Sequence, residues 1–111
     1  MASNQVVTSR ARHKPARAIK PHADKAAALL KALANEQRLM VLCNLLEGPL
    51  SVGELNERVT LSQSALSQHL GVLREANIVT TAREAQSIRY ALSSGAVTRI
   101  IEILYKEFCE S

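Results

Sequence analysis

The stretch LSQSALSQHLGVLRE, residues 61–75, combines regularly spaced leucines with a face of short polar side chains. On a helix of about 3.6 residues per turn, Leu66, Leu70 and Leu73 lie on one side. The opposite side carries serine, glutamine and glycine, and Arg74 lies at its edge. Hydroxyl and amide groups both donate and accept hydrogen bonds, as the base edges in the DNA major groove require. The stretch therefore predicts a helix that reads DNA bases.

The first turns of this helix are expected to lead into the groove, because recognition helices commonly touch bases with their N-terminal residues. Small residues on the same face let the helix axis approach the groove floor. His69 lies beside the leucines, which suits packing or a phosphate contact better than base readout. A solvated amphipathic helix is the alternative, but such faces usually carry Lys and Glu. The DNA contacts predicted from this helix are Ser62, Gln63, Ser64, Ser67, Gln68, His69 and Arg74.

Cys43 and Cys109 are the other residues able to do chemistry. The chain has no C-x-x-C motif and no apolar segment typical of a secretory signal, so we expect reduced thiols and a cytoplasmic protein. Cys43 lies at the edge of a helical apolar stripe. Cys109 lies far from the stripe of its own helix and should be the more accessible thiol. Thiol-based sensing and two merely structural thiols both remain open on the residues alone.

Other site chemistries find little support in the sequence. The chain has three histidines, and none pairs with a second ligand at metal-binding spacing, so neither a metal nor a cofactor is expected. There is no nucleophile–base pair, no glycine-rich phosphate loop and no paired carboxylates in a plausible cleft. An enzyme is therefore not expected.

The elements that position these residues follow from hydrophobic periodicity and from capping residues. Asn35 and Ser62 are suited to begin helices, Ser51 and Glu54 match the S-x-x-E capping box, and Gly48 with the following proline ends a helix. Two short helices joined by a brief connection form a helix-turn-helix pattern. The predicted helices cover residues 22–34, 35–47, 51–58, 62–76 and 94–108.

After Asn77 the apolar period changes to two, in runs rich in β-branched residues. The alternation of Ile78, Thr80 and Ala82, and then of residues 88–92, predicts two strands, with residues 83–87 at the hairpin tip. The fold class is therefore mainly α with a small β-hairpin: a winged helix-turn-helix in the order α-α-α-α-β-β-α. In the wing, Arg83, Gln86 and Arg89 are predicted to contact the DNA backbone or minor groove, and for Arg89 simple solvent exposure stays open.

Positive charge is concentrated at the start of the chain. Residues 1–20 hold five Lys/Arg and no acidic residue, whereas residues 21–111 hold nine Lys/Arg and ten Asp/Glu. We expect a flexible basic arm over 1–20 and a DNA-binding and dimerisation domain over 21–111. The arm either adds nonspecific attraction to phosphates or is simply solvated. No run of 18 apolar residues occurs, so no membrane partner is expected.

Four motifs together resemble the ArsR/SmtB family of small dimeric winged-helix repressors: ALAN-x-x-R, SVGEL, LSQSALSQHL-x-x-LR and R-x-A-Q-x-I-x-Y. Within the family the chain is similar to the HlyU, BigR and NolR branch, over about residues 22–110. The resemblance implies a homodimer, built by the first and last helices of that region, that binds double-stranded operator DNA. The residues that hold metals in other members are missing, because SVGELNERV lacks Cys, His and Asp and the last helix lacks His and Asp.

The resemblance also implies a role for the two cysteines. In that branch, cysteines at the positions of Cys43 and Cys109 sense sulfane sulfur or oxidants by forming a disulfide or polysulfide link within a subunit. The implied function is a transcriptional repressor that is released from operator DNA by oxidation or by persulfide or polysulfide chemistry, with reactive sulfur species or oxidants as inducers. The alternatives are a constitutive dimeric repressor with structural thiols and a winged-helix protein-interaction module.

Overall fold

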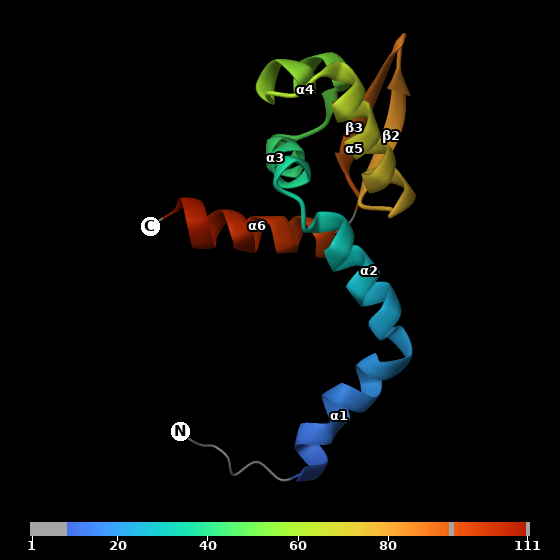
Figure 1. Ribbon diagram of the computed structural model, residues 1–111, viewed down its shortest axis with the longest axis vertical. Helices are drawn as coiled ribbons and strands as arrows, with labels where there is room; N and C mark the ends of the chain where they lie inside the picture. The colour runs from blue at the N-terminus through green and yellow to red at the C-terminus, as the bar shows by residue number, and fades with distance from the viewer. Residues whose placement is uncertain (1–8, 94, 111) are drawn as a thin grey trace.

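The computed structural model describes residues 9–93 and 95–110 (Figure 1). Its helices are mostly short, and the single sheet is small. In chain order the elements are α1 (Ser9–Ile19), the 3-10 helix η2 (Lys20–His22), α2 (Ala23–Leu33), α3 (Glu36–Asn44), the 3-10 helix η3 (Leu45–Glu47), β1 (Leu50–Ser51), α4 (Val52–Arg58), α5 (Gln63–Glu75), β2 (Val79–Glu84), β3 (Ser87–Leu92) and α6 (Gly95–Cys109).

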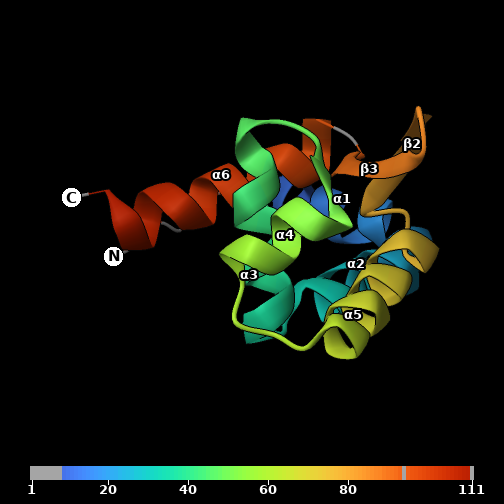
Figure 2. The ribbon, with the colours of Figure 1, turned by 90° about the horizontal axis from the view of Figure 1, so that it is seen from above.

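The helices α3, α4 and α5 pack around one apolar core, with the hairpin of β2 and β3 beside α5 (Figure 2). The predicted leucine stripe of α5 is confirmed, since Leu66, Leu70 and Leu73 are all buried. Leu42 of α3 and Ile101 of α6 belong to the same core. Burying a leucine side chain contributes about 1.5–3 kcal/mol, so this stripe fixes α5 on the domain and determines which face it presents outward.

Side-chain caps begin three of the helices at the predicted residues. The Asn35 side chain accepts two backbone N–H bonds of 3.0 Å at the start of α3. Ser51 and Glu54 form the capping box of α4. The Ser62 hydroxyl accepts a 3.1 Å bond from the Ala65 N–H at the start of α5. The predicted cap at residue 94 lies outside the described residues.

The sheet has three antiparallel strands in the order β1-β3-β2. Strand β1 was not expected, because two residues give no readable alternation. In the hairpin, Val79 pairs with Leu92 and Thr81 with Tyr90. Val79 is buried and Thr81 half-buried, whereas Thr80 is exposed. The predicted alternation of the first strand is therefore wrong by one position, because the chain turns out of α5 at Asn77 with a φ of 60° and shifts the phase.

The hairpin turn is Ala85 and Gln86, and Ala85 adopts a φ of 57°. Left-handed backbone costs an L-residue roughly 1–2 kcal/mol, whereas glycine tolerates it but loses about 0.5–1 kcal/mol more entropy on folding. We therefore expect Ala85→Gly to raise the free energy of unfolding by about 0.5–1 kcal/mol, as measured by urea denaturation. Ala82→Gly, within β2, is the matched control and should lower it by a similar amount. Equal losses in both variants would contradict the strained turn.

Residues 9–19 form helix α1, whereas the sequence predicted a structureless arm there. Its run of Arg, Lys, Ala and His is compatible with a helix, and Pro15 lies inside it. Figure 1 shows that α1 and η2 extend from the N-terminal end of α2, away from the other helices. The flexibility of the arm and the division of the chain at residue 20 stay predictions. None of the described helices is long and apolar enough to cross a membrane.

Candidate functional site

The outward face of α5 is polar and accessible along its length. Gln63, Ser64, Ser67 and Gln68 are exposed, and the buried leucines fix their direction away from the core. His69 is only half-buried beside the leucines, as the sequence predicted. The helix therefore presents amide and hydroxyl groups of the kind that can pair with base edges.

Ser62 differs from the predicted contacts within α5 because its hydroxyl caps the helix. It caps α5 and lies 3.4 Å from the Ser64 hydroxyl oxygen. Arg74 is exposed near the C-terminal end of the same helix. The structure thus places all the predicted α5 residues on or beside one accessible surface, and their contact with DNA stays a prediction.

Gly71 lies on the same exposed face, and a Cβ atom there would meet nothing within 4 Å. Alanine is preferred over glycine inside a helix by about 0.8–1.0 kcal/mol, so Gly71→Ala should stabilise the protein by nearly that amount in urea denaturation. It should at the same time weaken operator binding several-fold in a gel-shift titration, because the added methyl group holds the helix back from the groove. Gly53→Ala, in α4, is the control that should leave operator affinity unchanged. Tighter or equal binding by Gly71→Ala would argue against close groove insertion.

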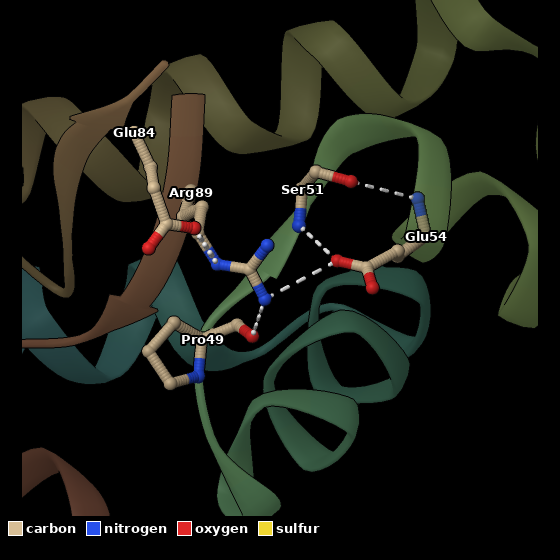
Figure 3. A network of polar contacts seen from close by, with 5 residues as sticks. All are labelled: Pro49, Ser51, Glu54, Glu84 and Arg89. Atoms are coloured by element: carbon tan, nitrogen blue, oxygen red, sulfur yellow. Dashed lines mark hydrogen bonds and ion pairs between the residues drawn. The ribbon is translucent and has the colours of Figure 1, made fainter. Parts of the chain in front are cut away.

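In the wing, Arg83 and Gln86 are exposed at and near the tip, where they can reach a DNA backbone. Arg89 is placed differently, facing the start of α4 (Figure 3). Its Nη2 atom donates a 3.0 Å hydrogen bond to the Pro49 carbonyl and lies 3.5 Å from Glu54 Oε1, and its Nε atom lies 3.5 Å from Glu84 Oε1. Arg89 therefore joins both wing strands to the helix-turn-helix.

Glu54 links Arg89 to the first turn of α4. Its Oε1 atom accepts a 2.9 Å hydrogen bond from the Ser51 backbone N–H. This bond, aided by the positive charge of Arg89, lowers the pKa of Glu54. A lowered carboxyl pKa means that the network stabilises the fold above the ordinary glutamate pKa and is lost as the pH falls through the folded value.

We expect Arg89→Gln to weaken operator binding several-fold without changing the preferred operator sequence, because the wing loses its attachment to α4 while α5 keeps its base-reading face. Electrophoretic titration against the operator and against single-base operator variants would measure both. Arg83→Gln is the matched control, since it removes a positive charge from the wing without touching the network. A larger loss in Arg83→Gln than in Arg89→Gln would identify phosphate attraction, rather than wing position, as the dominant effect. Arg89 was predicted as a DNA contact, and that role stays a prediction.

The two cysteines line one apolar groove between α3 and α6. Both are free thiols: Cys43 is half-buried on α3 and Cys109 is exposed at the end of α6. The groove has a volume of about 180 Å³, and its other lining residues are Leu39, Ile101, Leu104, Tyr105 and Phe108. Burial raises the pKa of the Cys43 thiol, and the nearby Cys109 raises it further. The predicted difference in accessibility is confirmed, and the structure brings the two thiols to one site.

Large apolar side chains remain exposed on the helices that were expected to form a dimer. Leu30 of α2 is 56% exposed, and Ile103 and Phe108 of α6 are 64% and 81% exposed. In both ribbon views the C-terminal end of α6 extends beyond the other helices (Figures 1 and 2). Sequence periodicity alone gave no sign that Tyr105 and Phe108 would share a groove with the cysteines. Within the described residues, His, Cys, Asp and Glu form no group of three or more able to hold a metal ion.

Known proteins are similar to this chain in sequence. Residues 35–81 match the family described as bacterial regulatory protein, arsR family. The chain is 55% identical over 87 residues to the transcriptional activator HlyU of Vibrio cholerae, covering 78% of this chain and 81% of HlyU. It is 50% identical over 95 residues to the biofilm growth-associated repressor of Agrobacterium fabrum, covering 86% of this chain and 81% of the repressor.

Solved structures agree on the fold. The structure of reduced HlyU from Vibrio cholerae superposes with a TM-score of 0.78 at 52% identity, covering 84% of this chain and 98% of HlyU. A homodimeric winged helix-turn-helix DNA-binding domain from Mycobacterium bovis superposes with a TM-score of 0.70 at 25% identity, covering 94% of this chain and 86% of that domain. The predicted winged helix-turn-helix is thereby confirmed, and the chain belongs to the arsR family of bacterial regulatory proteins, which are DNA-binding transcriptional regulators and not enzymes.

Proposed function

We propose that this regulator is a dimeric, sequence-specific repressor that leaves its operator when Cys43 and Cys109 become linked. The exposed polar face of α5 supports base readout, because Gln63 and its neighbours offer both donors and acceptors without a phosphate-binding excess of charge. Relatives carry the names activator and repressor, and occupying an operator can do either according to its position. The resemblance of the motifs favours repression over activation.

The dimer rests on exposed apolar surface. Exposure of apolar side chains to water costs free energy. A second copy packed against α2 and α6 would cover Leu30, Ile103 and Phe108. Two copies related by a two-fold axis present two α5 helices to half-sites about 34–36 Å apart on one DNA face. The homodimeric neighbour from Mycobacterium bovis has the same fold.

The groove that Cys43 and Cys109 share is the main support for the proposed thiol switch. Its other lining residues are all apolar or aromatic, and both cysteines face this one groove. Cys109 is the first nucleophile, because it is exposed, whereas the raised pKa of Cys43 leaves less thiolate at neutral pH. A solved relative is described as the reduced form, which agrees with thiol chemistry in proteins of this kind.

The reaction balances with a persulfide, RSSH, as the oxidant. The Cys109 thiolate attacks the outer sulfur, forming Cys109–S–SH and releasing the thiol RSH. The Cys43 thiolate then attacks the Cys109 sulfur, closing a disulfide and releasing H₂S. Two electrons pass from the thiol pair to the sulfane sulfur. If a second persulfide reacts before closure, extra sulfur atoms lengthen the link.

Closing the link would act on DNA binding through packing. It joins α6 to α3, and α3 packs against both α5 and α6. A small shift of α3 therefore changes the direction of α5 in each subunit and the spacing of the two recognition helices. A regulator tuned to fixed half-site spacing loses affinity when that spacing changes.

The test is operator binding by the reduced protein and by protein treated with a persulfide or with hydrogen peroxide, followed by reduction with dithiothreitol. Coupling between two sites is typically worth about 5–150-fold in affinity, so treated protein should bind more weakly by a factor in this range and recover on reduction. Mass spectrometry should place the link on Cys43 and Cys109. Equal affinity before and after treatment would leave a constitutive repressor with structural thiols, whereas absence of selective DNA binding would favour a protein-interaction module.

A further inference from the structure

The basic arm has no role in the proposed function, although it holds a large share of the positive charge. Lys14, Arg17 and Lys20 are exposed, and no ion pair involves them among the described residues. Residues 1–20 contain no acidic side chain that could neutralise the arm locally. Five concentrated charges repel one another, so the arm is stabilised by a polyanion nearby.

The shape of the subunit leaves this arm free to reach outward. The radius of gyration is 17.6 Å, whereas a compact domain of this length has about 13 Å. The longest dimension is 57 Å, and Figure 1 shows that α1 and η2 lie along it, away from the other helices. Helix α1 packs substantially against η2 alone. Its own subunit therefore covers almost none of its surface.

We propose that α1 and η2 bind the backbone phosphates of the DNA that flanks the operator. Charge complementarity identifies this partner. The body of the protein, residues 21–111, is close to neutral, and the α5 face reads bases with uncharged groups. A DNA-binding protein gains most of its salt-dependent affinity from Lys and Arg near phosphates, and here the arm supplies those cations.

Helix α2 connects the arm to the part of the domain that holds the recognition helix. Helix α2 packs against α5 and follows directly after η2 in the chain. It has 11 residues and a length of about 16 Å, and this one helix joins the arm to the domain. Lys14 and Arg17 are three residues apart and project from the same side of α1. Phosphate contacts of this kind add affinity without reading sequence.

The experiment compares two triple variants of the full-length, reduced protein. Lys14→Gln, Arg17→Gln and Lys20→Gln together neutralise the arm. The control replaces Lys25, Lys31 and Lys106 by glutamine, which removes the same charge from exposed positions on α2 and α6. Operator affinity is measured from 50 to 300 mM KCl by fluorescence anisotropy, with a long duplex that carries flanking DNA and a short duplex limited to the operator.

On the long duplex, the slope of log K against log salt concentration falls by about 0.9 for each phosphate that the protein no longer neutralises, so removing three cations from each of two subunits lowers it by up to about 5. The arm variant should show a drop of at least about 2 and the control none. The ratio of operator to random-sequence affinity should stay the same, and on the short duplex the two variants should behave alike. An unchanged slope in the arm variant overturns the proposal.

Two further measurements separate other partners for the arm. Dimer dissociation of the arm variant in analytical ultracentrifugation would overturn the proposal in favour of a contact with the partner subunit. Loss of binding to phosphatidylserine vesicles with an unchanged DNA slope would overturn it in favour of an anionic membrane surface. The proposal rests on DNA binding but not on the thiol switch. If the wild-type protein bound no operator, the proposed function itself would be wrong. If it bound normally and the arm variant had the same salt slope as the wild type, only the inference about the arm would be wrong.

Discussion

Replacing Gln63 and Ser67 by alanine is expected to weaken operator binding by at least about 100-fold, because each well-made base contact discriminates by about 1–3 kcal/mol. A symmetric dimer uses each residue twice, so the double variant removes both side chains from both half-sites. The loss is limited by nonspecific affinity, which typically lies about 4–10 kcal/mol below specific affinity. The double variant should therefore approach the binding of random DNA.

Selectivity, rather than affinity alone, identifies base readout in this experiment. The ratio of operator to random-sequence affinity, measured by competition at fixed salt, should fall close to one for Gln63→Ala with Ser67→Ala. Both side chains are exposed, so the free energy of unfolding should change by no more than about 0.5 kcal/mol. Gln37→Ala, at an exposed position of α3 outside the α5 face, is the control and should keep the ratio of the wild type. An unchanged ratio in the double variant would show that Gln63 and Ser67 do not read the bases.

Much of the fold follows from local sequence because strong local signals agree with the tertiary structure there. The Leu66, Leu70 and Leu73 stripe, the Asn35 cap and the capping box at Ser51 each depend on interactions within a few residues. Helix starts, the order of helices and the orientation of α5 could therefore be predicted.

The features that the sequence missed depend on contacts between distant segments. Strand β1 is two residues long and exists because Leu50 pairs with Tyr90, far along the chain. The turn at Ala85 lacks the usual glycine, so its position is determined by the register of β2 with β3 instead of by turn residues. The predicted alternation began at Ile78, which is buried but precedes β2, so the alternation of the strand itself starts one residue later, at Val79.

The candidate sites also include residues that local spacing predicts and residues whose role depends on distant contacts. The α5 residues share one helix, so their common face could be predicted from spacing. Arg89 appeared to be one more basic residue of the wing, because its partners Pro49 and Glu54 lie far before it in the sequence. The apolar groove around Cys43 and Cys109 likewise joins two helices whose approach no local pattern encodes.

Cys109→Ser is expected to abolish the release of operator DNA by persulfide while leaving reduced binding unchanged. Cys109 is exposed, so serine there costs little stability and removes the first nucleophile. Treated Cys109→Ser should keep the affinity of the reduced wild type, a difference of about 5–150-fold from the treated wild type. A fluorescence anisotropy titration of both proteins before and after treatment provides the measurement.

Cys43→Ala distinguishes the second step from the first. Alanine is chosen because Cys43 packs against the core, where a serine hydroxyl would be left without a partner in an apolar groove. This variant should gain one sulfur atom at Cys109 by mass spectrometry and still hold DNA, because no link joins α3 to α6. Release of DNA by treated Cys43→Ala would show that modification of Cys109 alone is sufficient and would contradict a linking switch.

The pH dependence of the wild-type reaction gives an independent check on the second step, the attack by Cys43. Burial raises the pKa of Cys43, so its thiolate is scarce at neutral pH and increases by about tenfold per pH unit until that pKa is reached. The rate of link closure in protein already carrying a Cys109 persulfide should increase in the same proportion, measured as release of H₂S and of labelled DNA. If closure were instead independent of pH between 6 and 8, a conformational step that brings the two sulfur atoms together, rather than thiolate formation at Cys43, would limit the switch.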